Sequence, residues 1–153
     1  DEPVSMSGLE AMTEVTGWKP PVGHTLAGTV FGQGRAPDTI LVTREFGRKH
    51  HPLPSLHLNS VQTEECDHRF LVANHSQPAR NFRVCALGAE GIASLKAVQV
   101  DSGRDLLAHP LLALRTIPSF WDRDRLAAVP LLNYFEAGMA AAEAGSTLAV
   151  RPF

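Results

Sequence analysis

Short runs in which β-branched and apolar residues alternate with polar ones recur from residue 24 onward, and Gly, Pro, Asn and Asp separate them. Such runs are typical of strands in antiparallel sheets, because successive side chains of a strand point to opposite faces. Residues 24–32 and 39–45, which flank a turn rich in Gly and Pro, predict a first β-hairpin. Residues 69–73 and 81–87, joined by a polar loop, predict a second hairpin.

Strand-like pattern returns in the C-terminal part of the chain. Residues 117–130 predict a strand, a tight turn at the charged residues 122–125 and a second strand, and residues 146–151 predict a closing strand. Residues 46–66 contain three His and two Pro with little pattern, which predicts a long loop. Helical spacing of apolar residues is limited to three short stretches, namely 88–96, 106–115 and the Ala-rich 137–145.

Together these elements predict an α+β fold, with a mostly antiparallel sheet or partial barrel and short helices packed on one side. Residues 1–16 have only a weak helical spacing, and two adjacent prolines favour an extended linker over 17–23. We therefore predict an N-terminal remnant and linker at 1–23 and one domain at 24–153. Because the first residue is Asp1 and not Met, we expect either a processed chain or a piece of a longer protein.

Charge and cysteine content restrict the partners and the compartment. The chain has 14 Lys and Arg against 16 Asp and Glu, a formal charge of -2, so any site for a polyanion must be a local patch. Two cysteines are too few for a disulfide scaffold, which favours the reducing cytoplasm. Every apolar stretch is far shorter than the ~20 residues of a membrane span, so we predict no membrane partner.

The motifs that usually carry metal or catalytic chemistry are missing from the sequence. His50, His51, His57 and Cys66 invite a metal hypothesis, but they lack the compact paired spacing of zinc sites, and we predict a solvated loop instead. Neither a Gly-x-Ser-x-Gly nucleophile elbow nor a Gly-rich phosphate loop occurs. We therefore predict no catalytic, cofactor-binding or metal-binding residue in this chain.

Three apolar side chains are predicted to be structural. Cys85 lies within an apolar strand and is expected to be buried. Phe120 and Trp121 could form a stacking platform, but their apolar neighbours favour a place in the core.

Basic residues form the most suggestive constellation. Arginine clamps phosphates through paired N–H donors, and a few such contacts are enough to position RNA. A solubilising surface role is the alternative for each residue. The candidate RNA-binding residues are Arg44, Arg48, Lys49, Arg69, Arg83 and Arg115.

The order of several short motifs resembles the C-terminal region of the tRNA(Ile)-lysidine synthetases of alphaproteobacterial type, also called the MesJ cell-cycle protein family. The resemblance covers residues 24–134. The family pattern has a glycine at two positions where this chain does not. The first is His68, within Cys-Asp-His-Arg-Phe, and the second is Arg123, after Trp-Asp, so the sequence does not decide the turn type at either place. The matching motifs are His24-Thr25-Leu26-Ala27-Gly28, Ile40-Leu41-Val42-Thr43-Arg44-Glu45, Asp67-His68-Arg69-Phe70, Leu87-Gly88-Ala89-Glu90-Gly91, Arg115-Thr116-Ile117-Pro118-Ser119-Phe120-Trp121-Asp122 and Leu126-Ala127-Ala128-Val129-Pro130.

This resemblance implies a function for the parent protein. The family uses ATP to adenylate the wobble cytidine of an isoleucine tRNA, and lysine then displaces AMP. The chemistry resides in an N-terminal PP-loop domain with a Ser-Gly-Gly-x-Asp-Ser motif, which residues 1–153 lack. The resemblance therefore implies a non-catalytic tRNA-recognition domain whose partners are isoleucine tRNA and its own PP-loop domain, with ATP bound only by the latter.

Two other classes of protein remain as alternatives. The first is a small structural or protein-interaction module, rich in β-strands and without a nucleic-acid role. The second is a metal-dependent enzyme that uses the histidines of residues 50–57 or Cys66. A gel shift with isoleucine tRNA against bulk tRNA tests the family reading, and metal analysis of the purified chain tests the enzyme.

Overall fold

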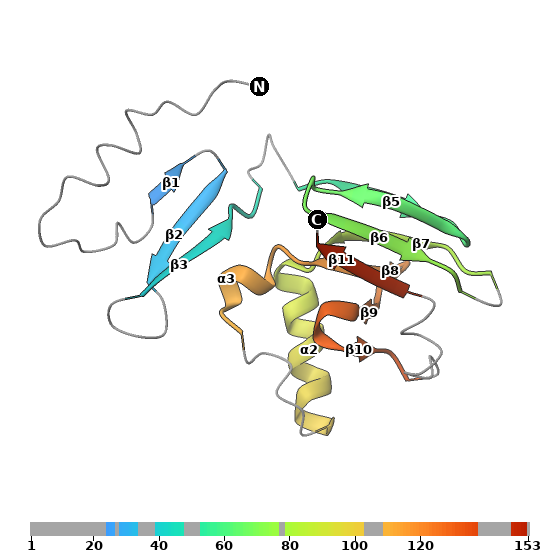
Figure 1. Ribbon diagram of the computed structural model, residues 1–153. Helices are drawn as coiled ribbons and strands as arrows, with labels where there is room; N and C mark the ends of the chain where they lie inside the picture. The colour runs from blue at the N-terminus through green and yellow to red at the C-terminus, as the bar shows by residue number, and fades with distance from the viewer. Residues whose placement is uncertain are drawn as a thin grey trace, which may run out of the picture. The chain divides into compact units, whose positions relative to one another are not determined.

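A computed structural model describes residues 24–26, 28–33, 39–47, 53–76, 79–102, 109–137 and 148–152 (Figure 1). The chain divides into two compact units, Asp1–Glu45 and Phe46–Phe153, and each is described by itself. The predicted remnant and linker at 1–23 lie outside the described residues, as does nearly all of the Ala-rich stretch predicted to be helical. The predicted domain boundary after residue 23 therefore stays a prediction.

The first unit contains a three-stranded antiparallel sheet in the order β1-β2-β3. Its strands are β1 His24–Leu26, β2 Thr29–Gln33 and β3 Ile40–Arg44. The predicted hairpin is confirmed, since β2 pairs with β3 from Thr29↔Arg44 to Gln33↔Ile40. The single strand predicted over 24–32 is wrong, because the chain reverses at Gly28 and Leu26 pairs with Thr29. Gly28 has a φ of 73°, a left-handed conformation that glycine adopts without steric cost.

The second unit contains two further antiparallel sheets. One has five strands in the order β10-β9-β8-β7-β4, and the other has three in the order β11-β6-β5. The strands predicted over 69–73, 81–87, 117–130 and 146–151 are all present. Their bounds, with those of the other strands, are β4 Ser55–Leu58, β5 Gln62–Cys66, β6 Phe70–Asn74, β7 Phe82–Ala86, β8 Pro118–Asp122, β9 Arg125–Val129, β10 Tyr134–Phe135 and β11 Leu148–Pro152.

Two sequence predictions for this unit are wrong. The long loop predicted over 46–66 contains β4 and β5, and the strand pattern of β5 is hidden because it is an edge strand in which only Cys66 is buried. The predicted second hairpin does not form, since β6 pairs with β5 and β11 whereas β7 pairs with β4 and β8. Strands that follow one another in the chain here belong to different sheets.

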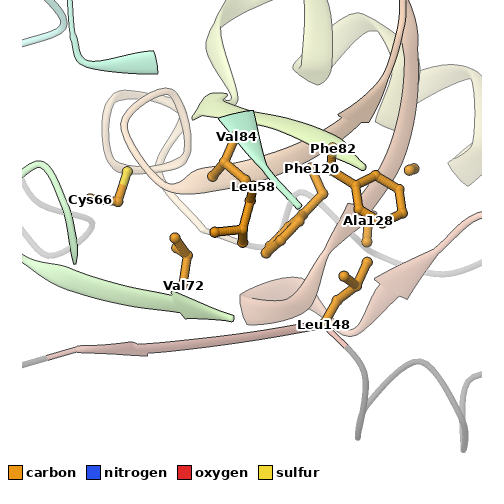
Figure 2. Close-up of a cluster of buried hydrophobic side chains, with 9 residues drawn as sticks. Leu58, Cys66, Val72, Phe82, Val84, Phe120, Ala128 and Leu148 are labelled. Atoms are coloured by element: carbon orange, nitrogen blue, oxygen red, sulfur yellow. The ribbon is translucent and has the colours of Figure 1, made fainter. Parts of the chain in front are cut away.

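The first hydrophobic core lies between these two sheets. Val72 and Leu148 of the three-stranded sheet face Leu58, Phe120 and Ala128 of the five-stranded sheet, as Figure 2 shows. All five side chains are buried. Because each sheet presents every second residue to this layer, the opposite face of the five-stranded sheet is left for other elements.

Helices cover that opposite face. They are α2 Gly88–Ser102, α3 Leu111–Leu114 and the 3-10 turn η1 Pro130–Leu132. Leu95 of α2 and Leu114 of α3 join Trp121 of β8 in a second buried cluster, so the prediction that Phe120 and Trp121 belong to the core is confirmed. The prediction that Cys85 is buried is wrong, since its side chain is only half-buried, opposite the exposed Ser55 of the edge strand β4.

The architecture is thus helices, a five-stranded sheet and a three-stranded sheet in successive layers. This confirms an α+β fold with mostly antiparallel sheets and short helices on one side. In the part of the chain that the structure describes, the sheets do not close into a barrel. None of the helices within the described ranges has the length and apolar character needed to cross a membrane.

Two tight turns of the second unit contain non-glycine residues in the left-handed backbone conformation. Asp67 and His68, between β5 and β6, have φ of 54° and 49°. Arg123, between β8 and β9, has φ of 56°. Non-glycine residues rarely adopt this conformation, because Cβ then crowds the following carbonyl oxygen.

Candidate nucleic-acid interface

Arg44 of the first unit is engaged within its own sheet. Its Nη1 donates a hydrogen bond to the carbonyl oxygen of Gly28 at 3.0 Å, and the backbone N–H of Glu45 donates to the same oxygen at 2.7 Å. The fit is tight, since a Cβ at Gly28 would lie 2.4 Å from Arg44 Nη1. Arg44 thus ties the β1–β2 turn to β3. Arg48 and Lys49, predicted to act with it, lie outside the described residues.

Arg69 of the second unit joins two distant segments. Its Nε and Nη2 approach Asp67 Oδ2 at 2.8 and 2.7 Å, and Nη2 also donates to the carbonyl oxygen of Thr116 at 2.8 Å. The guanidinium lies 4.8 Å from the ring centroid of Phe70. These contacts connect the β5–β6 turn with the segment before β8. Arg69 is a structural residue in this arrangement, and a phosphate would have to displace Asp67.

Arg83 lies on the helix-covered face of β7, at its edge. Its Nη1 is 3.2 Å from Cys85 Sγ, and its guanidinium lies 5.4 Å from the centroid of Trp121. Opposite it on β4 is the exposed His57. Burial raises the pKa of the Cys85 thiol, and the Arg83 charge opposes that rise. Arg83 is half-buried and engaged by these two contacts.

Among the candidates that the structure describes, Arg115 has the most open position. It follows α3 directly and its side chain is exposed. Together with Lys96 it lines a groove of about 380 Å³ between α2 and α3, whose other lining residues are Ala89, Ile92, Ala93, Leu111 and Leu112. The volume lies within the ~300–1,000 Å³ range of ligand pockets. Neither cation has a carboxylate partner among the described residues.

The sequence positions the groove through simple spacing. Small Ala89 and Ala93 lie one turn apart on α2 and leave room, and Lys96 continues the same helix face. On the other side, Pro110 precedes α3, and its carbonyl oxygen accepts bonds from the N–H groups of Ala113 and Leu114 at 3.0 and 3.1 Å. Sequence reasoning missed Lys96, although its three- and seven-residue spacing from the two alanines was a usable signal.

The second unit holds only part of the predicted set. Arg69 and Arg83 lie in the second unit with Arg115, but Arg69 is held by Asp67 and Arg83 packs on Trp121. Arg80, which the sequence prediction left out, is likewise paired, with Nη2 at 2.6 Å from Asp122 Oδ2. Of the cations considered in this unit, Lys96 and Arg115 are the two that line a groove together without a carboxylate partner among the described residues.

The described residues contain no group of three His, Cys, Asp or Glu side chains that could hold a metal ion. His50 and His51 lie outside those residues. Burial, followed by the nearby charge of Asp67, raises the pKa of the Cys66 thiol, which keeps it protonated at neutral pH. Comparison with protein-family models, curated proteins and solved structures found no match.

Proposed function

We propose that this chain is the non-catalytic, tRNA-recognising C-terminal domain of a cytoplasmic tRNA(Ile)-lysidine synthetase. In this proposal ATP binds to an N-terminal PP-loop domain, which is also a partner of the chain. The second unit binds phosphates of isoleucine tRNA through the groove between α2 and α3, which holds Lys96 and Arg115.

The observation that carries the family assignment is the backbone at two turns. The lysidine synthetase pattern has glycine where this chain has His68 and Arg123. Both residues have positive φ, 49° and 56°, which is the conformation that a glycine in those turns would supply. The chain thus departs from the family pattern in side chain while the backbone keeps the shape that the pattern requires.

The groove supplies a means of binding. Lys96 and Arg115 place two cations beside an apolar surface that includes the half-exposed Leu111 and Leu112. Phosphate contacts from a few cations position an RNA without reading its sequence. A local pair of this kind also agrees with a formal net charge of -2 for the whole chain.

A gel shift with the complete chain tests the proposal. We expect a complex with an isoleucine tRNA transcript that bulk tRNA competes away only in excess. The double variant K96Q/R115Q should weaken that complex. Its matched control is R123Q/R151Q, which removes the same charge from two exposed arginines, one in the β8–β9 turn and one on β11.

Three outcomes decide the matter. Weakening by K96Q/R115Q alone supports the assignment of the groove. Equal binding by both double variants and the unmodified chain contradicts it. Absence of any preference for isoleucine tRNA over bulk tRNA rejects the tRNA-recognition role, and the protein-interaction module then becomes the better description.

A further inference from the structure

An exposed aromatic ring stands next to the groove. Phe46, the first residue of the second unit, is 45% exposed, whereas Phe82 and Phe120 of the same unit are completely buried. Its ring packs against Gly88, where a Cβ would lie 3.3 Å from Phe46 Cζ. Gly88 also has a φ of 63°, so both the ring contact and the backbone favour glycine there.

Arg115 links this ring to the groove. Its guanidinium lies 5.9 Å from the centroid of Phe46, within reach of a cation–π contact. The backbone keeps the two parts in place, since the N–H of Gly88 donates to the carbonyl oxygen of Arg115 at 3.0 Å. The guanidinium of Arg115 therefore lies over the Phe46 ring at the start of α2.

Lys96 extends the charged surface along the helix. It is eight residues after Gly88 on α2, which corresponds to about 12 Å of helix. Arg115 and Lys96 line the same groove, and the half-exposed Leu111 and Leu112 form its apolar wall. An occupant that fits this surface has a flat apolar group at one end and negative charge distributed along its length.

We propose that Phe46, Arg115 and Lys96 form a binding site for an unpaired segment of RNA, with one base stacked on Phe46 and phosphates on the two cations. This inference rests on the proposed function and identifies which kind of RNA structure the groove takes. Unpaired nucleotides are suited to it, because their bases are free to stack on aromatic rings and arginine planes, which bases within a duplex are not. A purely apolar partner would leave both cations without a counter-charge.

Fluorescence anisotropy with two RNA probes tests the site in the complete chain. The probes are a labelled ten-nucleotide oligouridylate and a labelled ten-base-pair RNA duplex. We expect the single strand to bind more tightly than the duplex. Phe46→Leu should weaken the single strand at least fivefold, since base–aromatic stacking contributes that much or more, whereas Phe46→Tyr, which restores a ring, should retain most of the affinity.

The outcomes separate this inference from the function on which it rests. Equal affinity of Phe46→Leu and the unmodified chain for the oligouridylate overturns the stacking site, as does a preference for the duplex, even if isoleucine tRNA still binds. Ring-dependent binding of the oligouridylate without preference for isoleucine tRNA keeps the site and rejects the tRNA role.

A measurement on the unmodified chain protects the test against a misfolded variant. Oligouridylate containing 5-iodouridine is photo-crosslinked to the chain, and the attached peptide is identified by mass spectrometry. We expect the adduct on Phe46. An adduct found only on other peptides contradicts the proposal.

Discussion

Replacing His68 and Arg123 by glycine should stabilise the second unit. Both residues have positive φ in tight turns, and each stands where the lysidine synthetase pattern has glycine. The His68 side chain is 96% exposed, and among the described residues its ring is bonded to Glu65 alone. Little packing is therefore lost with either side chain, and the backbone effect decides the result.

The size of the gain follows from two opposing effects. A left-handed conformation costs an L-residue about 1–2 kcal/mol. Replacing the residue by glycine removes this cost, but glycine loses more conformational freedom on folding, which reduces the gain by about 0.5–1 kcal/mol. Loss of the exposed contact with Glu65 costs at most about 0.5 kcal/mol. We expect a net gain of about 0.5–1 kcal/mol for Arg123→Gly and slightly less for His68→Gly.

The two gains should add. Arg123 follows the last residue of β8, whereas the turn of His68 is tied by Arg69 to Thr116, just before that strand begins. A five-residue strand spans about 17 Å, which exceeds the range at which substitutions couple. The double variant should gain about 1–1.5 kcal/mol, or roughly 4–8 °C in Tm.

Urea unfolding followed by tryptophan fluorescence measures this in a Trp18→Phe background, which leaves the buried Trp121 as reporter of the second unit. Asp124→Gly is the matched control, since Asp124 lies in the same turn as Arg123 and its φ is not positive. It should lose stability. If both turn glycines destabilise the unit as much as this control does, the reasoning about the turns is refuted.

Two further outcomes follow from the contacts of the second unit. Arg69→Ala should cost about 2 kcal/mol of unfolding free energy, because it leaves the nearly buried Asp67 without this partner. Arg125→Ala removes an arginine whose side chain is 77% exposed and should cost about 0.5 kcal/mol or less. Equal losses would contradict the structural role of Arg69. Burial raises the pKa of the Cys66 thiol, so in a Cys85→Ser background its alkylation should need a higher pH than that of free cysteine. The folded state holds this proton more tightly than the unfolded state, so the associated stability is present below the ordinary thiol pKa and is lost as pH rises through the raised value. An alkylation profile identical to that of free cysteine would contradict the burial of Cys66.

The positions of the strands could be predicted from the sequence better than the pairing between strands could. Residues 117–130 contain two largely apolar runs on either side of the charged residues 122–125, and β8 and β9 pair across that turn as predicted. By contrast, β6 and β7 read as a hairpin because they are consecutive, yet they lie in different sheets. Pairing is decided by which faces bury apolar side chains across the whole unit, and local pattern does not contain that information.

The two strands of residues 46–66 were hidden for a different reason. Strand β5 lies at the edge of its sheet, so Thr63, Glu64 and Glu65 remain exposed and no apolar alternation develops. Edge strands commonly carry such charges. Strand β4 is only four residues long, Ser55–Leu58, and follows a proline.

The candidate site was predictable only in part. Arg115 could be singled out by charge and position, but the site also needs Lys96 and Phe46. Lys96 shares the groove between α2 and α3 with Arg115, and Phe46 reaches Arg115 from the segment before β4, so both contacts depend on the tertiary fold. Arg69 illustrates the opposite case. It was predicted to bind RNA, but the structure holds it on Asp67, two residues earlier, and on Thr116, a contact that depends on the tertiary fold.

The salt dependence of isoleucine tRNA binding tests the central claim most directly. Each phosphate contact contributes roughly 0.7–0.9 to the slope of log affinity against log salt concentration. The account predicts that K96Q/R115Q lowers the magnitude of this slope by about 1.5, whereas R123Q/R151Q leaves it nearly unchanged. Identical slopes for the unmodified chain and K96Q/R115Q would contradict the claim that the groove between α2 and α3 holds the phosphates of the tRNA.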